Sequence, residues 1–218
     1  MTAENQSART SETKDTTLQA PHENDAKTVR TSSRKGLANS VLGTRNLMTV
    51  AALSVVGLII LIPLNYVSVG LMATPQMILI GSSLMGLWVI PYMLPISVVR
   101  RPGATMLAAL IMGIICIFTT PDGVGAIIGN LIGGLFIEVP FAVMLYRKWT
   151  WWAHLISAGV FGTLNGLMYL KVLEKGMNIT IGSGIVVAAI TSALVGALIV
   201  LGLTRLLQRA GVGVANQA

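Results

Sequence analysis

One acidic residue, Glu138, stands inside an apolar run, GNLIGGLFIEVPFAVMLYR, at residues 129–147. A lone carboxylate in lipid costs at least ~2.5 kcal/mol, so we expect this side chain to face a bundle interior or a wet cavity. Four-residue spacing places Asn130, Gly134 and Glu138 on one helix face. Pro140, two residues further on, leaves one backbone carbonyl without its helical donor. A carboxylate in this setting attracts a cation or accepts paired hydrogen bonds from an N–C–N edge such as that of an aminopyrimidine.

Other polar and aromatic residues near the ends of the apolar runs could complete a pocket around that carboxylate. Asn165 and Tyr169 are one helical turn apart, and the flat ring of Trp88 could stack on an aromatic or cationic ligand. Taken singly, such residues serve packing or the membrane interface more often than ligand contact. Together they predict a substrate-binding pocket formed by Glu138, Asn130, Asn165, Trp88, Tyr169, Gln76 and Tyr66.

The sequence carries no recognisable catalytic or metal-binding set. Its two histidines are His22 and His154, and its single cysteine is Cys116, so neither a disulfide within the chain nor a thiolate metal cluster is possible. The apolar runs contain no Ser/His/Asp or Cys/His combination, and the GxxxxGK[ST] signature of P-loop ATPases does not occur. We therefore expect a protein that is not an enzyme and holds no metal or cofactor.

The composition is typical of a membrane protein. Hydrophobic residues make up 54% of the 218 residues and charged residues 11%, and the mean hydropathy is +0.76. No charged residue occurs between Arg45 and Arg100, or between Lys175 and Arg205. A bilayer core of ~30 Å needs about 20 apolar residues per helix, and the runs lack the period-two alternation of barrel strands. We therefore expect transmembrane helices.

Charged residues and chain breakers divide the apolar sequence into predicted spans. We place six of them, at 46–65, 76–99, 103–119, 124–146, 152–171 and 181–207. This predicts an all-α, polytopic fold with one six-helix transmembrane domain over residues 46–208. Residues 1–45 are rich in Thr, Ser, Asn and charge, and are predicted to be a disordered cytoplasmic tail. Residues 209–218 are predicted to be a short cytoplasmic tail.

The distribution of basic residues predicts the orientation. The formal net charge is +7, and seven of the 15 Lys and Arg residues lie in the first 45 positions. Near the predicted helix ends, ten cations fall on one face and two on the other. Because cytoplasmic loops carry the excess of Lys and Arg, both termini should be cytoplasmic. The placement of this charge beside apolar runs argues against a nucleic-acid partner.

Small residues recur at every fourth position in three of the predicted helices. Such rows let helices approach closely where lipid supplies no hydrophobic driving force. We favour packing inside the bundle over an external docking face as their role. The rows are Gly125, Gly129 and Gly133; Ala158, Gly162 and Gly166; and Ala189, Ala193 and Ala197.

The segments RRPGATMLAAL and GNLIGGLFIEVPFAVMLYRKW carry a family resemblance. Together they resemble the YkoE type of substrate-binding (S) component of energy-coupling factor (ECF) transporters, over roughly residues 46–207. In that family an Arg-Pro-Gly-Ala start precedes a Gly-rich helix with a Glu, an apolar-aromatic pair and a Tyr-Arg end. The matching residues here are Arg101, Pro102, Gly103, Ala104, Gly134, Glu138, Phe141, Tyr146 and Arg147.

The resemblance implies a six-helix protein of the bacterial cell membrane that binds a vitamin or its precursor from outside. Its partners would be a transmembrane coupling (T) subunit and two cytoplasmic ATPase subunits. The implied ligand is thiamine or its hydroxymethylpyrimidine moiety, which agrees with the separate argument from Glu138 because thiamine is cationic and carries an aminopyrimidine edge.

Two other functions stay open from the sequence. The first is a self-sufficient carrier in which Glu138 exchanges protons for a small organic cation. The second is an assembly subunit whose polar stripe contacts another membrane protein. A binding subunit should bind its ligand tightly as an isolated chain, with uptake that depends on its partners. A self-sufficient carrier should show gradient-driven transport by the chain alone. An assembly subunit should show neither.

Overall fold

The computed structural model describes residues 43–71, 75–177 and 184–211, all within one unit of the chain, Asn39–Ala218. These residues form α2 (Gly43–Leu71), α3 (Pro75–Ser83), α4 (Met85–Val99), α5 (Ala104–Thr119), α6 (Gly125–Val143), α7 (Trp151–Met177) and α8 (Gly184–Arg209). The described part contains no β-strand, which confirms the all-α prediction there. Most of the predicted N-terminal tail, up to residue 42, and residues 212–218 lie outside the described residues.

The helices correspond to the six predicted segments, but α2 and α7 run past their predicted ends at residues 65 and 171, to Leu71 and Met177. Two other segments differ in kind. The second predicted segment is a pair of helices, α3 and α4, interrupted at Leu84. The fourth, predicted to reach residue 146, ends at Val143. There the chain turns, because Leu145 and Tyr146 adopt left-handed φ angles of 54° and 52°. The sequence stays apolar through this turn, so composition alone did not mark the helix end.

Ser192 of α8 bridges the interruption between α3 and α4. Its Oγ accepts a hydrogen bond from the Gly86 N–H at 2.8 Å and donates one to the Ser83 carbonyl. The backbones of α4 and α8 touch at this point: a Cβ at Gly86 would lie 2.1 Å from the Ser192 carbonyl oxygen, and one at Gly196 would lie 2.2 Å from the Gly86 oxygen. One hydroxyl thus satisfies two backbone groups that the break removes from helical pairing.

The small-residue rows divide into two kinds. Those of α7 and α8 pack against each other: Ala189 and Ala193 are fully buried, and a Cβ at Gly162 would lie 2.8 Å from the Ala189 carbonyl oxygen. This confirms the predicted packing role for that pair of helices. In α6, a Cβ at Gly133 would lie 3.1 Å from the Tyr92 ring, whereas one at Gly125 or Gly129 would meet nothing within 4 Å. The packing role thus holds for Gly133, and the other two glycines leave space beside the helix.

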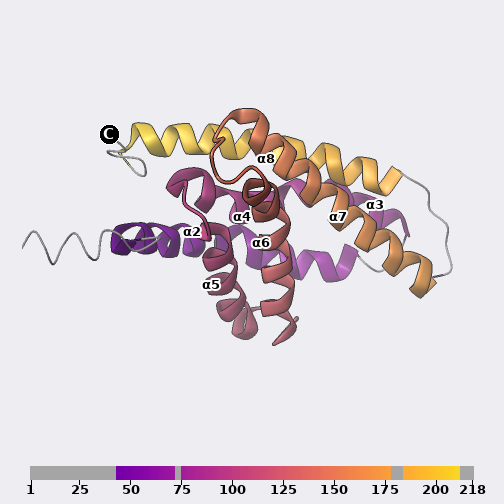
Figure 1. Cartoon of the computed structure of the whole chain (residues 1–218). Helices are drawn as coiled ribbons and strands as arrows, with labels where there is room; N and C mark the ends of the chain where they lie inside the picture. The colour runs from indigo at the N-terminus through magenta and orange to yellow at the C-terminus, as the bar shows by residue number, and fades with distance from the viewer. Residues whose placement is uncertain (1–42, 72–74, 178–183, 212–218) are drawn as a thin grey trace, which may run out of the picture. The chain divides into compact units, whose positions relative to one another are not determined.

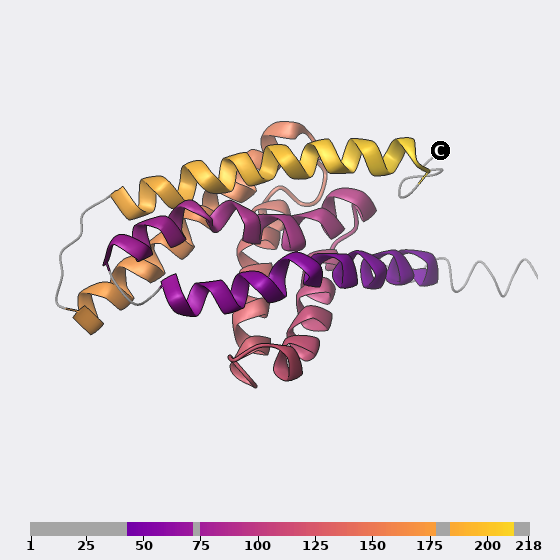
Figure 2. The same cartoon turned by 180° about the vertical axis from the view of Figure 1, so that it is seen from behind.

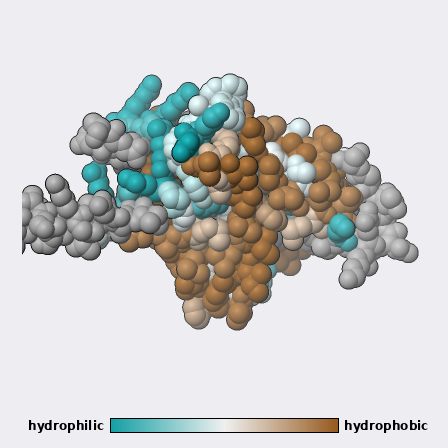
Figure 3. Space-filling view, in the orientation of Figure 1, coloured by the Kyte–Doolittle hydropathy of each residue, from teal (hydrophilic) through white to brown (hydrophobic). Residues whose placement is uncertain are grey.

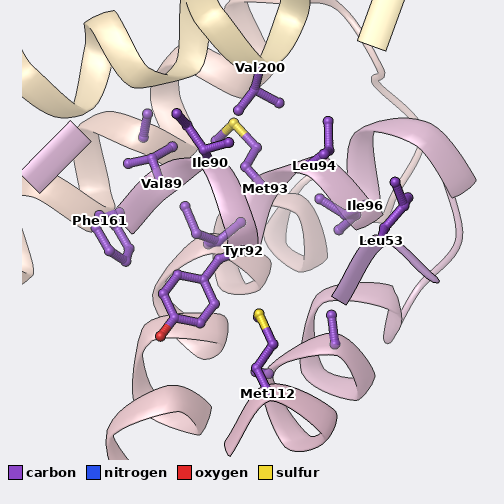
Figure 4. Close-up of a cluster of buried hydrophobic side chains, with 14 of the residues drawn as sticks. Leu53, Val89, Ile90, Tyr92, Met93, Leu94, Ile96, Met112, Phe161 and Val200 are labelled. Atoms are coloured by element: carbon purple, nitrogen blue, oxygen red, sulfur yellow. The ribbon is translucent and has the colours of Figure 1, made fainter. Parts of the chain in front are cut away.

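The core is centred on α4, whose sequence MGLWVIPYMLPISVV is apolar on every side and is buried at almost every position. Figure 4 shows Val89, Ile90 and Met93 of this helix near Val200 of α8, with Met112 of α5 on the side of Tyr92; all belong to one buried cluster. In both Figure 1 and Figure 2, α2, α8 and the α3–α4 pair run in broadly the same line, and the α5–α6 hairpin crosses them steeply.

Four helices in the described part are long and apolar enough to cross a membrane: Gly43–Leu71, Met77–Val99, Gly125–Val143 and Gly184–Arg209. At 16 residues, α5 is a shorter apolar helix. Figure 3 shows hydrophilic side chains gathered at the end of the molecule where α2 begins and α8 ends, while brown, hydrophobic surface covers the α5–α6 hairpin. The fold is therefore that of a multi-pass membrane protein with one polar end.

Candidate functional site

The cavity

A partly open cavity of about 520 Å³ lies among α2, α4, α6 and α7. It lies where α2 and α7 approach their C-terminal ends and where α4 and α6 begin. The connections from α4 to α5 and from α6 to α7 contribute no residue to its lining. The cavity is lined by Asn65, Ser68, Val69, Met85, Trp88, Tyr92, Asp122, Gly125, Ala126, Gly129, Asn130, Gly133, Phe161, Asn165 and Tyr169.

Four of the residues predicted from the sequence to bind substrate meet in this cavity. Trp88 comes from α4, Asn130 from α6, and Asn165 and Tyr169 from α7. Tyr66 is not among the lining residues, and its side chain is 57% exposed. The side chain of Gln76 lies outside the described part of the chain. These four residues form an aromatic and amide set from three different helices.

Hydrogen bonds within the protein orient two of the three lining amides, Asn130 and Asn165. The Asn130 Nδ2–H donates to the Ala126 carbonyl at 2.7 Å, and the Tyr92 hydroxyl donates to Asn130 Oδ1 at 2.9 Å. Figure 4 shows the Tyr92 hydroxyl at the far end of its ring, pointing away from the labelled core residues. The Asn165 Nδ2–H donates to the Phe161 carbonyl at 2.9 Å. In both amides an N–H is taken by the preceding turn, which fixes the side chain and leaves carbonyl oxygen capacity for a ligand.

The hydroxyl of Ser68 is arranged in the same way. It donates to the Asn65 carbonyl at 2.7 Å, so its lone pairs stay open to accept. With the Asp122 carboxylate and the Asn65 amide, the wall therefore carries five side chains that have acceptor oxygens, set among the rings of Trp88 and the other aromatic lining residues. Such a surface suits a flat ligand that donates hydrogen bonds or carries positive charge.

Several lining residues were not predicted from the sequence, above all Asp122. It belongs to the turn FTTPDGVG before α6, which was interpreted only as a chain break. Tyr92 and Phe161 lie within apolar runs, where an aromatic residue gives no sign of facing a cavity. The predicted orientation could have indicated Asp122, because it places that turn on the same side of the membrane as the end of the fifth predicted span.

The buried carboxylate

Glu138 has other partners. It is 5% exposed and does not line the cavity described above. Its Oε1 accepts hydrogen bonds from the Gly103 N–H and, at 3.0 Å, from the Tyr146 hydroxyl, and its Oε2 accepts one from the Met106 N–H at 3.0 Å. The expectation that Glu138 faces the ligand cavity is therefore corrected: in this structure its oxygens accept hydrogen bonds from the start of α5 and from Tyr146.

The start of α5 explains why a carboxylate is needed there. Gly103, the residue before the helix, has a φ of 81° and no side chain, so it supplies no capping oxygen. The first N–H groups of a helix lack helical partners and favour an anion. Glu138, reaching across from α6, caps them in place of a local Ser, Thr or Asp.

Tyr146 completes this cluster from the turn after α6. Partial burial and the neighbouring Glu138 charge, which its hydroxyl hydrogen-bonds, raise the pKa of Tyr146 from its ordinary 10.0 to about 12. Both causes favour the protonated phenol, which keeps the hydrogen bond to the carboxylate intact. Glu138 thus links the start of α5 to the end of α6.

Comparisons with known proteins

The fold and the cavity define a class: a helical multi-pass membrane protein with a ligand-sized cavity at one end. The family model "ABC-type cobalt transport system, permease component" matches residues 45–164, more than half of the chain. The chain belongs to this family.

A solved structure has a similar fold. A crystal structure of an S-component of an ECF transporter matches with a TM-score of 0.67 and 17% sequence identity, covering 77% of this chain and 86% of that one. At this identity the likeness shows the fold alone. No curated protein matches the sequence.

Proposed function

We propose that this chain is the substrate-binding subunit of an ECF-type importer, of the YkoE type, and that it captures thiamine or its hydroxymethylpyrimidine precursor. The observation that carries the proposal is the cavity wall, in which Asn130, Asn165 and Ser68 each have one donor engaged by the protein and have acceptor capacity left over. The S-component fold and the family membership support the same class of function.

The ligand chemistry follows from that wall. An aminopyrimidine ring presents N–H donors along one edge and two flat faces, and it suits carbonyl acceptors between aromatic rings. The thiazolium ring of thiamine adds a positive charge, which the faces of Trp88, Tyr92 and Tyr169 attract. The cavity, at about 520 Å³, lies within the size range of small-molecule sites.

The family description names cobalt, so a metal ion is the competing cargo. Divalent cobalt is best held by imidazole, thiolate and carboxylate ligands in a compact group. Within the described residues, no group of three or more His, Cys, Asp and Glu side chains could hold a metal ion. The cavity lining instead combines amides with aromatic rings. We therefore propose an organic ligand and keep Co²⁺ as an arm of the test.

The proposed topology has six membrane-spanning helices with both termini in the cytoplasm of a bacterial cell. On the positive-inside rule, the connections that carry Arg100, Arg101, Arg147 and Lys148 lie on the cytoplasmic side. The cavity then opens to the outside, as capture before import requires. A transmembrane T subunit and two ATPase subunits would drive release inward, and the chain itself would perform no chemistry.

The hydrogen bonds of Glu138 argue against the alternative function, a proton-coupled carrier. That alternative needs Glu138 to meet substrate and protons in turn. The carboxylate instead accepts hydrogen bonds from Gly103, Met106 and Tyr146. We therefore do not propose it as a second function.

Calorimetric titration of the detergent-purified full chain tests the proposal, with thiamine, hydroxymethylpyrimidine and Co²⁺ as separate ligands. We expect one or both organic compounds to bind, and Trp88→Ala to weaken that binding more than about tenfold, which is ~1.4 kcal/mol. Trp151→Ala is the matched control, because Trp151 is 62% exposed and does not line the cavity. Binding of Co²⁺ alone, or uptake by the chain alone in liposomes under a proton gradient, would overturn the proposal.

A further inference from the structure

Asp122 is the only carboxylate among the described residues that line the cavity. It lies in the turn between α5 and α6, where it is exposed to solvent, and its backbone carbonyl accepts a hydrogen bond from the Gly125 N–H at 3.1 Å. Asp122 thus contributes a full negative charge at the mouth of the cavity.

The other lining residues leave this charge uncompensated. None of them is Lys, Arg or His. The remaining polar lining side chains are neutral: Asn65, Ser68, Asn130, Asn165 and the two tyrosines. A ligand entering from the mouth therefore passes one anionic group and then meets amides and ring faces.

The amides and rings cannot by themselves distinguish a neutral ring from a charged one as sharply as a carboxylate can. Acceptor oxygens satisfy an aminopyrimidine edge whether or not a cationic ring is attached to it. A carboxylate about 6 Å from a positive charge, in an effective dielectric of about 40, changes the affinity by roughly tenfold. An exposed carboxylate is also screened by salt, so its effect should weaken as ionic strength rises.

We infer that Asp122 is the charge-selecting residue of this cavity, and that it makes the protein prefer a ligand with a permanently cationic ring over the neutral aminopyrimidine alone. The inference rests on the proposed function and deepens it, since it chooses thiamine over hydroxymethylpyrimidine as the preferred cargo. Asp122 lies just before the start of α6, whereas Glu138, the carboxylate first considered from the sequence, lies near the end of that helix. Only Asp122 lines the cavity.

A purely structural role for Asp122 makes a different prediction. An Asp just before a helix stabilises the partial positive charge of the helix start. Replacing it would then lower the stability of the protein and weaken both ligands alike. Charge selection instead predicts a change in the ratio of the two affinities, which a general loss of stability does not produce.

The experiment compares wild type, Asp122→Asn and Asp122→Glu by calorimetric titration at pH 8, where the aminopyrimidine is uncharged. Each protein is titrated with thiamine and with hydroxymethylpyrimidine at about 50 mM and about 500 mM salt. We expect Asp122→Asn to weaken thiamine about tenfold at low salt, to leave hydroxymethylpyrimidine within about twofold, and to abolish the salt dependence of thiamine binding. Asp122→Glu, which keeps the charge, should retain most of the preference for thiamine.

The outcomes separate the two proposals. Equal weakening of both ligands in Asp122→Asn, or an unchanged affinity ratio, overturns the charge-selecting role and leaves the proposed function standing. A wild-type chain that binds neither compound overturns the proposed function and this inference with it.

Discussion

The Glu138 carboxylate accepts a hydrogen bond from the backbone N–H of Gly103, a residue 35 positions earlier in the chain. This contact explains how an acid is tolerated deep in an apolar helix. Its oxygens also accept from Met106 and Tyr146, so the charge is compensated by three donors and by the start of α5. The acid is part of the scaffold that holds α5 against α6.

Glu138→Gln should therefore lower stability and leave ligand binding nearly unchanged. The amide keeps one acceptor oxygen and places an N–H₂ group opposite a backbone donor, so we expect a loss of about 2 kcal/mol. Thermal unfolding of the detergent-solubilised protein measures the loss, and titration of the folded fraction measures binding. A loss of affinity greater than about tenfold at unchanged stability would contradict this and show that Glu138 takes part in ligand binding.

The Tyr146 hydroxyl should make stability depend on pH in the alkaline range. Its pKa is raised from 10.0 to about 12 in the folded protein, so the stabilisation is fully present below pH 10 and is lost as the pH rises through 12. Melting temperatures between pH 8 and pH 12 should fall less steeply in Tyr146→Phe than in wild type. Tyr66→Phe is the control, since Tyr66 is 57% exposed, and it should leave the slope unchanged. Equal slopes in wild type and Tyr146→Phe would refute the coupling.

Gly86→Ala should damage the fold severely. The added Cβ would lie 2.1 Å from the carbonyl oxygen of Ser192, so α4 and α8 would have to separate. We expect a loss of about 3 kcal/mol or more, or failure to accumulate in the membrane. At Gly202, on α8, a Cβ meets nothing within 4 Å, so Gly202→Ala should be neutral or slightly stabilising. The two variants are compared by yield and melting temperature, and similar behaviour would contradict the close approach.

Asn165→Ala should weaken ligand binding without unfolding the protein. It removes the carbonyl oxygen that α7 offers to the cavity, while the lost bond to the Phe161 carbonyl is local to one helix. A fall in thiamine affinity of about tenfold is expected. Thr163→Ala, on the same helix, removes a similar bond to Gly159 but no lining group, and its affinity should match that of wild type. A tenfold loss in both variants would indicate a general effect of disturbing α7.

Part of the site could be predicted from polar and aromatic residues within the assigned spans. Asn165 and Tyr169 lie near one end of the fifth predicted span, and Trp88 lies near the middle of the second. In the structure all three line one cavity. Asp122 was not predicted, because the turn between spans was interpreted only as a boundary.

Composition and charge by themselves indicated a helical membrane protein. Runs of about 20 apolar residues match the thickness of a bilayer core, and backbone groups in lipid must pair within helices. Only the tertiary structure decided the role of Glu138 and the break at Leu84. In both cases the deciding partner is a backbone group exposed by a helix end or interruption: the Gly103 N–H for the carboxylate, and the Ser83 carbonyl for the Ser192 hydroxyl. Every residue has a backbone carbonyl, and every residue except proline has an N–H, so the sequence does not show which of these groups will be unpaired. The unpaired groups are set by where helices end, and their partners by which side chains then come within reach.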